Sequence, residues 1–330
     1  MRFIGIVSGC VMLSVSGWGA PSNLPVRAVS GRSAVSGAAL ARFYGARWEV
    51  MEDGGARLTH PRFSLRLHAD GRRATLMGVG LMLRYPPPDG RGRIGWLHRT
   101  DVEDLLDPIL RPSVRLRDQK AAVIVLDPGH GGRDGGAVGV GGLLEKDLTL
   151  DVALRARALL AVSGLEVVLT RETDEFVALD ERVRRAAAHR ADVLISLHFN
   201  AAPDARVRGI ETYIAPSDTR RAADGPLRVG TAGAESRAAA SAVLGFLLQC
   251  HTVRRTGGED RGLRQAPFAV LREATVPAAL VEGGFLSNPE EARRIVEGPG
   301  RDRLAEGIAR AVADYAAVVR RARLIHAAMP

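Results

Sequence analysis

The sequence has little cysteine and few aromatic residues, and it lacks long apolar runs after its first segment. Its two cysteines, Cys10 and Cys250, are too few for a disulfide framework or a cysteine-ligated zinc site. Aromatic residues make up only 5% of the chain. Hydrophobic residues at 46% and charged residues at 25% are nevertheless ordinary for a globular protein, which excludes a disordered or collagen-like chain.

Lysine is also scarce, so the positive charge comes from arginine. The 330 residues carry a formal net charge of +9, and only Lys120 and Lys146 among the 46 basic residues are lysines. We interpret this arginine excess as compositional. On charge alone, nucleic acid, anionic lipid and cell-wall polymer are all open as partners. No basic stretch is interleaved with aromatic residues as in single-strand binders, so we expect no nucleic-acid partner.

The first twenty residues have the pattern of a secretory signal peptide. Arg2 precedes the apolar run 3–7, and small residues lead to Pro21. The run is too short and too rich in glycine and serine for a membrane span, so we expect no stable membrane insertion. The sequence therefore predicts an exported protein of the periplasm or cell envelope. The stretch 7–10 also looks like a lipoprotein box, which leaves lipidation at Cys10 as an alternative.

Residues 21–115 are expected to form a small α+β module. Residues 63–68 alternate between apolar and polar, and a turn at Asp70-Gly71 leads to residues 74–77, which predicts a hairpin. Residues 101–106 predict a short helix capped by Thr100. The module loosely resembles the copper-amine-oxidase-type N-terminal module of some bacterial exported enzymes. That resemblance implies no copper.

From residue 121 to about 325 the pattern predicts an α/β domain. Strands are expected at residues 122–126, 167–169, 193–197, 210–214, 268–271 and 278–281, and helices at 148–160, 179–190, 236–248, 289–296 and 303–320. Alternating strands and helices predict a three-layer sandwich with a central, mostly parallel or mixed sheet flanked by helices.

Polar side chains follow the ends of several of these strands. His130 follows the first, His198 the third and Glu282 the last, while Glu145 opens the helix after a glycine-rich loop. Carboxyl ends of strands meet at one edge of such a sheet. Two histidines and a carboxylate are the ligand set of a catalytic zinc site, and a further carboxylate can move the proton of a water. Taken singly, each residue could be structural, and the glycines after His130 could form a turn or hold a phosphate.

Separated motifs resemble one enzyme family, the zinc-dependent N-acetylmuramoyl-L-alanine amidases of bacterial cell-wall turnover. The motifs are IVLDPGHGGRDGG (124–136), EKD (145–147), LTR (169–171), ISLHFNA (195–201) and VEGGFLSN (281–288). The resemblance covers about residues 121–320. It implies that His130, Glu145 and His198 hold zinc, that Glu282 is the catalytic acid/base, and that peptidoglycan is cleaved between N-acetylmuramic acid and L-alanine.

Two other functions remain open at this point. One is a zinc carboxypeptidase or endopeptidase acting on the stem peptides of peptidoglycan, and the other is a non-catalytic cell-wall-binding protein. The connection 216–235 contains Pro226 and several glycines and lacks an apolar stripe. We therefore expect a polar rim loop, an open site and no need for an activator protein. Arg171, Asp174 and Arg182 are expected to form a surface ion network, with a contact to substrate as the alternative.

Overall fold

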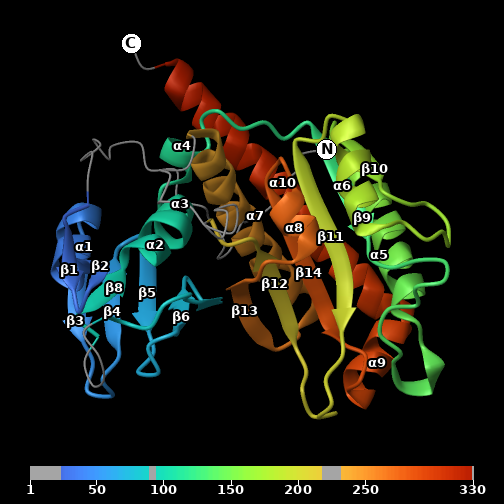
Figure 1. Cartoon of the computed structure of the whole chain (residues 1–330), viewed down its shortest axis with the longest axis horizontal. Helices are drawn as coiled ribbons and strands as arrows, with labels where there is room; N and C mark the ends of the chain where they lie inside the picture. The colour runs from blue at the N-terminus through green and yellow to red at the C-terminus, as the bar shows by residue number, and fades with distance from the viewer. Residues whose placement is uncertain (1–23, 89–93, 218–231, 329–330) are drawn as a thin grey trace, which may run out of the picture. The chain divides into compact units, whose positions relative to one another are not determined.

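The computed structural model describes residues 24–88, 94–217 and 232–328 (Figure 1). The expected signal peptide, with Cys10, lies outside these ranges, as does residue range 218–231 of the expected rim loop. The chain divides into two compact units, Met1–Pro112 and Ser113–Pro330.

The first unit is built from antiparallel strands and short helical segments, as expected for an α+β module. Its elements are β1 (Val26–Val29), β2 (Arg32–Ser36), α1 (Gly37–Tyr44), β3 (Arg47–Val50), β4 (Ala56–His60), β5 (Phe63–Leu67), β6 (Arg73–Leu76), β7 (Val79–Met82), β8 (Trp96–His98), α2 (Arg99–Asp101), the π-helical turn η1 (Val102–Leu106) and α3 (Asp107–Leu110). Strands β3 to β7 pair in chain order, and β2 pairs with both β1 and β8.

The predicted hairpin is present, but the predicted helix differs in its start and its winding. In the hairpin, Leu65 of β5 faces Leu76 of β6, and both are buried. The helical segment begins at Arg99 instead of Asp101, and the side chain of His98, rather than that of Thr100, accepts the first free N–H. The carboxylate of Asp101 accepts hydrogen bonds from the backbone N–H groups of residues 84 and 85.

The second unit contains the alternating strands and helices. Its elements are β9 (Val123–Pro128), the short 3-10 turn η2 (Val140–Gly142), α5 (Glu145–Leu160), β10 (Glu166–Leu169), α6 (Leu179–Ala188), β11 (Val193–Asn200), β12 (Ile210–Ile214), α7 (Ala232–Thr256), β13 (Asp260–Gln265), α8 (Ala269–Glu273), β14 (Ala278–Phe285), α9 (Pro289–Val296) and α10 (Gly298–Ala327), and the short helix α4 (Pro112–Arg115) spans the division between the units.

The strands of this unit form a mixed sheet in the order β10-β9-β11-β14-β12-β13. Strands β10, β9, β11 and β14 run parallel, β12 runs antiparallel to β14, and β13 runs parallel to β12. The four parallel strands therefore bring their carboxyl ends to one edge, which is the edge where ligand sites form in such folds.

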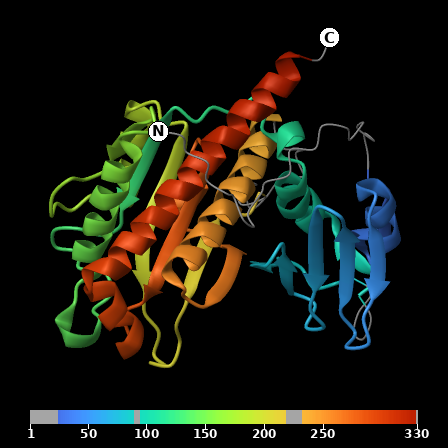
Figure 2. The ribbon, with the colours of Figure 1, turned by 180° about the vertical axis from the view of Figure 1, so that it is seen from behind.

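Helices cover both faces of the sheet. Helices α5, α7 and α10 pack together on one face, and Figure 2 shows α10 running across that face between the other two. Helices α6 and α8 cover the opposite face, where Val125, Leu194 and Leu280 are buried against them. The side chains of α10 that face the sheet layer are spaced three and four residues apart, as an amphipathic helix requires. The predicted three-layer sandwich is confirmed.

One expectation in this unit is wrong, and one strand was not predicted. Residues 268–271 do not form a strand, because residues 269–273 form helix α8. A short apolar run has no decisive periodicity, so burial of Val270 and Leu271 is compatible with either element. Strand β13 was not expected, because five of its six residues are polar, charged or glycine and only Leu263 supplies an apolar side chain to the core.

Among the described residues, no helix combines the length and the apolar character that a membrane crossing requires.

We predict that a chain beginning at Ser113 folds without the first unit. It has its own buried core on both faces of its sheet, and its length of about 200 residues exceeds what one core needs. Thermal unfolding followed by far-ultraviolet circular dichroism should show one cooperative transition and a mixed α/β spectrum. A featureless melt would show that this unit depends on residues 1–112.

Candidate metal centre and catalytic carboxylate

All four predicted site residues lie at the carboxyl-terminal edge of the parallel strands. His130 follows β9 by two residues, and Glu145 is the first residue of α5. His198 lies near the end of β11, and Glu282 is its register partner on the neighbouring strand β14. Residues from four separate segments thus meet at one place, because parallel pairing aligns the strand ends.

Glu145 joins the two histidines. Its Oε2 lies 3.1 Å from Nε2 of His130, and its Oε1 lies 2.8 Å from Nδ1 of His198. The backbone N–H groups of Ala137 and Phe199 each donate to one of the same oxygens, at 2.8 and 3.0 Å. Burial alone raises the pKa of Glu145, but these hydrogen bonds outweigh it and hold the pKa far below the ordinary value. The carboxylate is therefore ionised and fixed in orientation.

Two glycines allow the ligand groups to approach one another. A Cβ at Gly129 would lie 2.3 Å from the ring of His198, and a Cβ at Gly136 would lie 2.6 Å from Glu145 Oε2. Any side chain at either position would therefore displace the imidazole or the carboxylate. Gly129 and Gly136 of the first motif thus serve the close packing around His198 and Glu145.

The donor set fits zinc by its chemistry. One ligand atom from each of His130, Glu145 and His198 lies within 4.8 Å of the other two. Imidazole nitrogen and carboxylate oxygen are preferred zinc ligands, and three protein ligands leave a coordination position open. His130 also has the outer partner that such ligands need, because its Nδ1 lies 2.9 Å from Asp134 Oδ2. Burial lowers the pKa of His130, but its contacts with Glu145 and Asp134 outweigh burial and raise it.

Glu282 has an environment different from that of Glu145. Its Oε2 is shielded from solvent and has no hydrogen-bond partner among the described residues. Burial raises the pKa of Glu282 to about 7, and the nearby carboxylates of Glu145 and Glu211 act in the same direction. A carboxyl group with a pKa near neutrality can both accept and return a proton, which is the property of a general acid/base.

Glu211, the second neighbour of Glu282, was not predicted as a site residue from the sequence. Glu211 on β12 lies opposite Glu282 in the antiparallel register and is only 2% exposed. Arg261 donates to its Oε1 at 2.6 Å, and the hydroxyl of Tyr213 donates to its Oε2 at 2.6 Å. The signal was a glutamate inside the predicted strand 210–214, since buried carboxylates are rare without partners.

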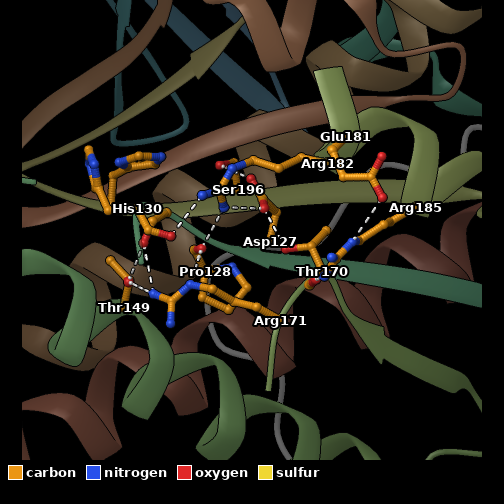
Figure 3. Close-up of polar contacts among 12 residues, drawn as sticks. Asp127, Pro128, His130, Thr149, Thr170, Arg171, Glu181, Arg182, Arg185 and Ser196 are labelled. Atoms are coloured by element: carbon orange, nitrogen blue, oxygen red, sulfur yellow. Dashed lines mark hydrogen bonds and ion pairs between the residues drawn. The ribbon is translucent and has the colours of Figure 1, made fainter. Parts of the chain in front are cut away.

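The expected surface network of Arg171, Asp174 and Arg182 is wrong for both arginines. Arg171 and Arg182 are buried, whereas Asp174 is exposed and pairs with Lys146 at 2.6 Å. The guanidinium of Arg182 lies 2.8 Å from the fully buried carboxylate of Asp127 (Figure 3). Charge in the sequence cannot distinguish a surface arginine from one that satisfies buried acceptors.

The donor set at the carboxyl edge of the parallel strands, with a further carboxyl group beside it, fits the site of a hydrolase. Residues 124–314, more than half of the chain, match the family described as N-acetylmuramoyl-L-alanine amidase. The chain belongs to this family.

Individual relatives agree with this assignment. The chain is 36% identical over 185 residues to N-acetylmuramoyl-L-alanine amidase LytC of Bacillus subtilis (56% of this chain, 34% of the relative) and 34% identical over 225 residues to the amidase AmiC of Neisseria meningitidis (61% and 54%). The match thus spans about a third and about half of these relatives. The solved catalytic domain of the amidase CwlV from Bacillus (Paenibacillus) polymyxa has a TM-score of 0.51 and 35% identity (59% of this chain, 98% of that chain).

The raised pKa of Glu282 predicts a pH dependence of folding stability in chelator-treated protein. Between its ordinary value of 4.5 and about 7, the unfolded chain ionises this carboxyl while the folded chain keeps it protonated, so stability falls as pH rises through this window. The full effect is at most about 3 kcal/mol. The glutamine of Glu282→Gln cannot ionise, so the variant does not lose this stability as pH rises. The difference in free energy of unfolding, variant minus wild type, should therefore be larger at pH 8 than at pH 5.

Urea titrations at both pH values measure this difference. Glu273→Gln, at an exposed glutamate of α8, is the matched control and should show no such change. Equal pH dependence in the wild type and Glu282→Gln would mean that Glu282 titrates as an ordinary surface carboxyl.

Proposed function

We propose that this chain is a zinc-dependent amidase that hydrolyses the amide between N-acetylmuramic acid and the L-alanine of peptidoglycan stem peptides. The observation that carries the proposal is the convergence of His130, Glu145 and His198 beside the near-neutral carboxyl of Glu282. Membership of the amidase family supports this choice of bond, and the names of the relatives agree with it.

In this proposal His130, Glu145 and His198 hold the metal. A zinc ion bound there supplies a Lewis acid for the amide carbonyl and lowers the pKa of a coordinated water to about 7. Glu145 keeps a fixed negative charge between the imidazoles, and Asp134 orients the ring of His130. These contacts prepare the donor atoms before the substrate arrives.

Glu282 moves the proton. Its carboxylate accepts a proton from the water that attacks the amide carbon, and it delivers that proton to the nitrogen of L-alanine as the C–N bond breaks. The products are a free carboxylate on the lactyl group of muramic acid and a peptide with a free amino terminus. A pKa near 7 suits both directions of this transfer.

The remaining expectations form part of the proposal. We propose that residues 1–20 direct export, that residues 21–115 form an accessory module and that residues 121–325 form the catalytic domain. The exported chain would then act on peptidoglycan in the periplasm or cell envelope. We also propose that no activator protein is required.

Digestion of purified sacculi tests the reaction. We expect released peptides that begin with L-alanine and glycan strands that carry free lactyl carboxylates, both identified by mass spectrometry. Stem peptides shortened within the peptide would instead identify a carboxypeptidase or endopeptidase. Wall binding without any soluble product would identify a non-catalytic wall-binding protein.

Metal analysis tests the ligand set. His130→Ala and His198→Ala should each lose the stoichiometric zinc that we expect in the wild-type protein, because each removes one of three protein ligands. His189→Ala, at an exposed histidine that ends α6, is the control and should keep its zinc. Full zinc retention in both site variants would overturn this ligand assignment.

Glu282→Gln tests the proton carrier. The substitution preserves shape but removes the base, so we expect normal zinc content and a loss of hydrolysis of at least about 100-fold. Glu273→Gln again serves as the control. Near-normal hydrolysis would mean that Glu282 is structural, whereas loss of zinc would make it a ligand.

A further inference from the structure

Two buried arginines hold the polypeptide that carries the proposed metal ligands. Arg171 follows β10 and is 1% exposed, and Arg182 lies on α6 and is 3% exposed. Figure 3 shows both side chains reaching toward the segment of Asp127, Pro128 and His130. Both donate to the carbonyl oxygen of Pro128, Arg171 through Nε at 3.0 Å and Arg182 at 2.7 Å.

Arg182 fixes the backbone of His130 itself. One of its terminal nitrogens donates to the carbonyl oxygen of His130 at 2.7 Å, and the other lies 2.8 Å from Asp127 Oδ1. His130 has a φ of 61°, in the left-handed region that non-glycine residues rarely adopt. A strained residue keeps such a conformation only where its surroundings enforce it, and the guanidinium of Arg182 supplies that constraint.

Arg171 joins two ligand-bearing segments. One of its terminal nitrogens donates to the carbonyl oxygen of Gly129, next to His130, at 2.9 Å. The same nitrogen donates to the carbonyl oxygen of Lys146, next to Glu145, at 2.7 Å. The hydroxyl of Thr149 on α5 also donates to Gly129, at 2.9 Å. These contacts fix the distance between the loop of His130 and the helix of Glu145.

The acceptors of Arg171 argue against a role in fold stability alone. Every acceptor that the structure describes for it is a backbone carbonyl or the Thr149 hydroxyl, and none is a carboxylate. Burying a cation is costly, and apolar side chains of similar volume often stabilise a core better. The chain nevertheless places this cation where it contacts the neighbours of two proposed ligands.

We propose that Arg171 and Arg182 are positioning residues that set the spacing of His130 and Glu145 and thereby the affinity of the metal centre. This inference rests on the proposed function, because it takes those side chains as zinc ligands. The planar fork of arginine reaches several carbonyls at fixed angles, whereas the single ammonium of lysine cannot. Lysine substitutions therefore keep the charge near Asp127 but loosen the ligand segments.

The test measures zinc affinity of the full chain by competition with a chromophoric chelator. Arg171→Lys and Arg182→Lys should each bind zinc about 10- to 100-fold more weakly than the wild type, the usual effect of losing an outer-shell contact. Arg185→Lys is the matched control. Arg185 lies one turn further along α6 and donates to Thr170 and Glu175, but not to the segment of His130. The zinc affinity of the Arg185→Lys variant should therefore equal that of the wild type.

Two further measurements separate positioning from general stability. The cobalt-substituted variants should show an altered visible absorption spectrum, because the ligand geometry changes, whereas Arg185→Lys should match the wild type. Thr149→Val removes the hydroxyl that contacts Gly129, Lys146 and Arg171 with little change in volume, and it should weaken zinc binding relative to the wild type. It keeps the proposal testable if either arginine variant fails to fold.

The outcomes distinguish the two levels of the argument. A wild-type chain that binds no zinc would overturn the metal centre of the proposed function. A wild type that binds zinc, with Arg171→Lys and Arg182→Lys equal to it in affinity and spectrum, would overturn only the positioning role. Weaker binding with an unchanged cobalt spectrum and a matching loss of thermal stability would assign both arginines to fold stability instead.

Discussion

The carboxylate of Glu145 is the contact on which the site depends. It accepts from two backbone N–H groups and lies against two imidazoles, so it fixes His130 and His198 relative to each other. Because its negative charge is held in a buried place, the site favours a cation between the same groups. Glycines at 129 and 136 follow from this requirement, since a side chain at either position would separate the groups that Glu145 joins.

The other two carboxylates at this edge show how partners decide a carboxyl group's role. Glu211 and Glu282 lie opposite each other on neighbouring strands; Glu211 is buried, and the Oε2 atom of Glu282 is shielded from water. Arg261 and Tyr213 satisfy Glu211, so its charge is compensated. Glu282 Oε2 has no such donor among the described residues, and burial beside other carboxylates raises its pKa. The same residue type thus has hydrogen-bond donors at one position, and at the next it lies beside other carboxylates with a raised pKa.

Three of the four predicted site residues could be placed near one another from the sequence because they lie at predicted strand ends, which are easy to recognise, and Glu145 opens the helix that follows the first of these strands. Apolar runs such as 193–197 end in polar residues, and parallel strands align those ends. Two elements could not be predicted from the sequence pattern. Strand β13 is mostly charged or polar, and helix α8 is too short for its periodicity to identify it. The roles of the site residues in zinc binding and proton transfer remain predictions.

The buried arginines could not have been predicted, and the reason lies in the backbone. Pro128 and Gly129 are buried and His130 has a left-handed backbone, so the carbonyls of this segment lack regular backbone partners and need other donors. Helix and sheet partners cannot supply donors to so irregular a segment, so long side chains from β10's end and from α6 do. The loop that carries His130 thus needs long side-chain donors such as arginine, and that need depends on backbone geometry that no sequence pattern records.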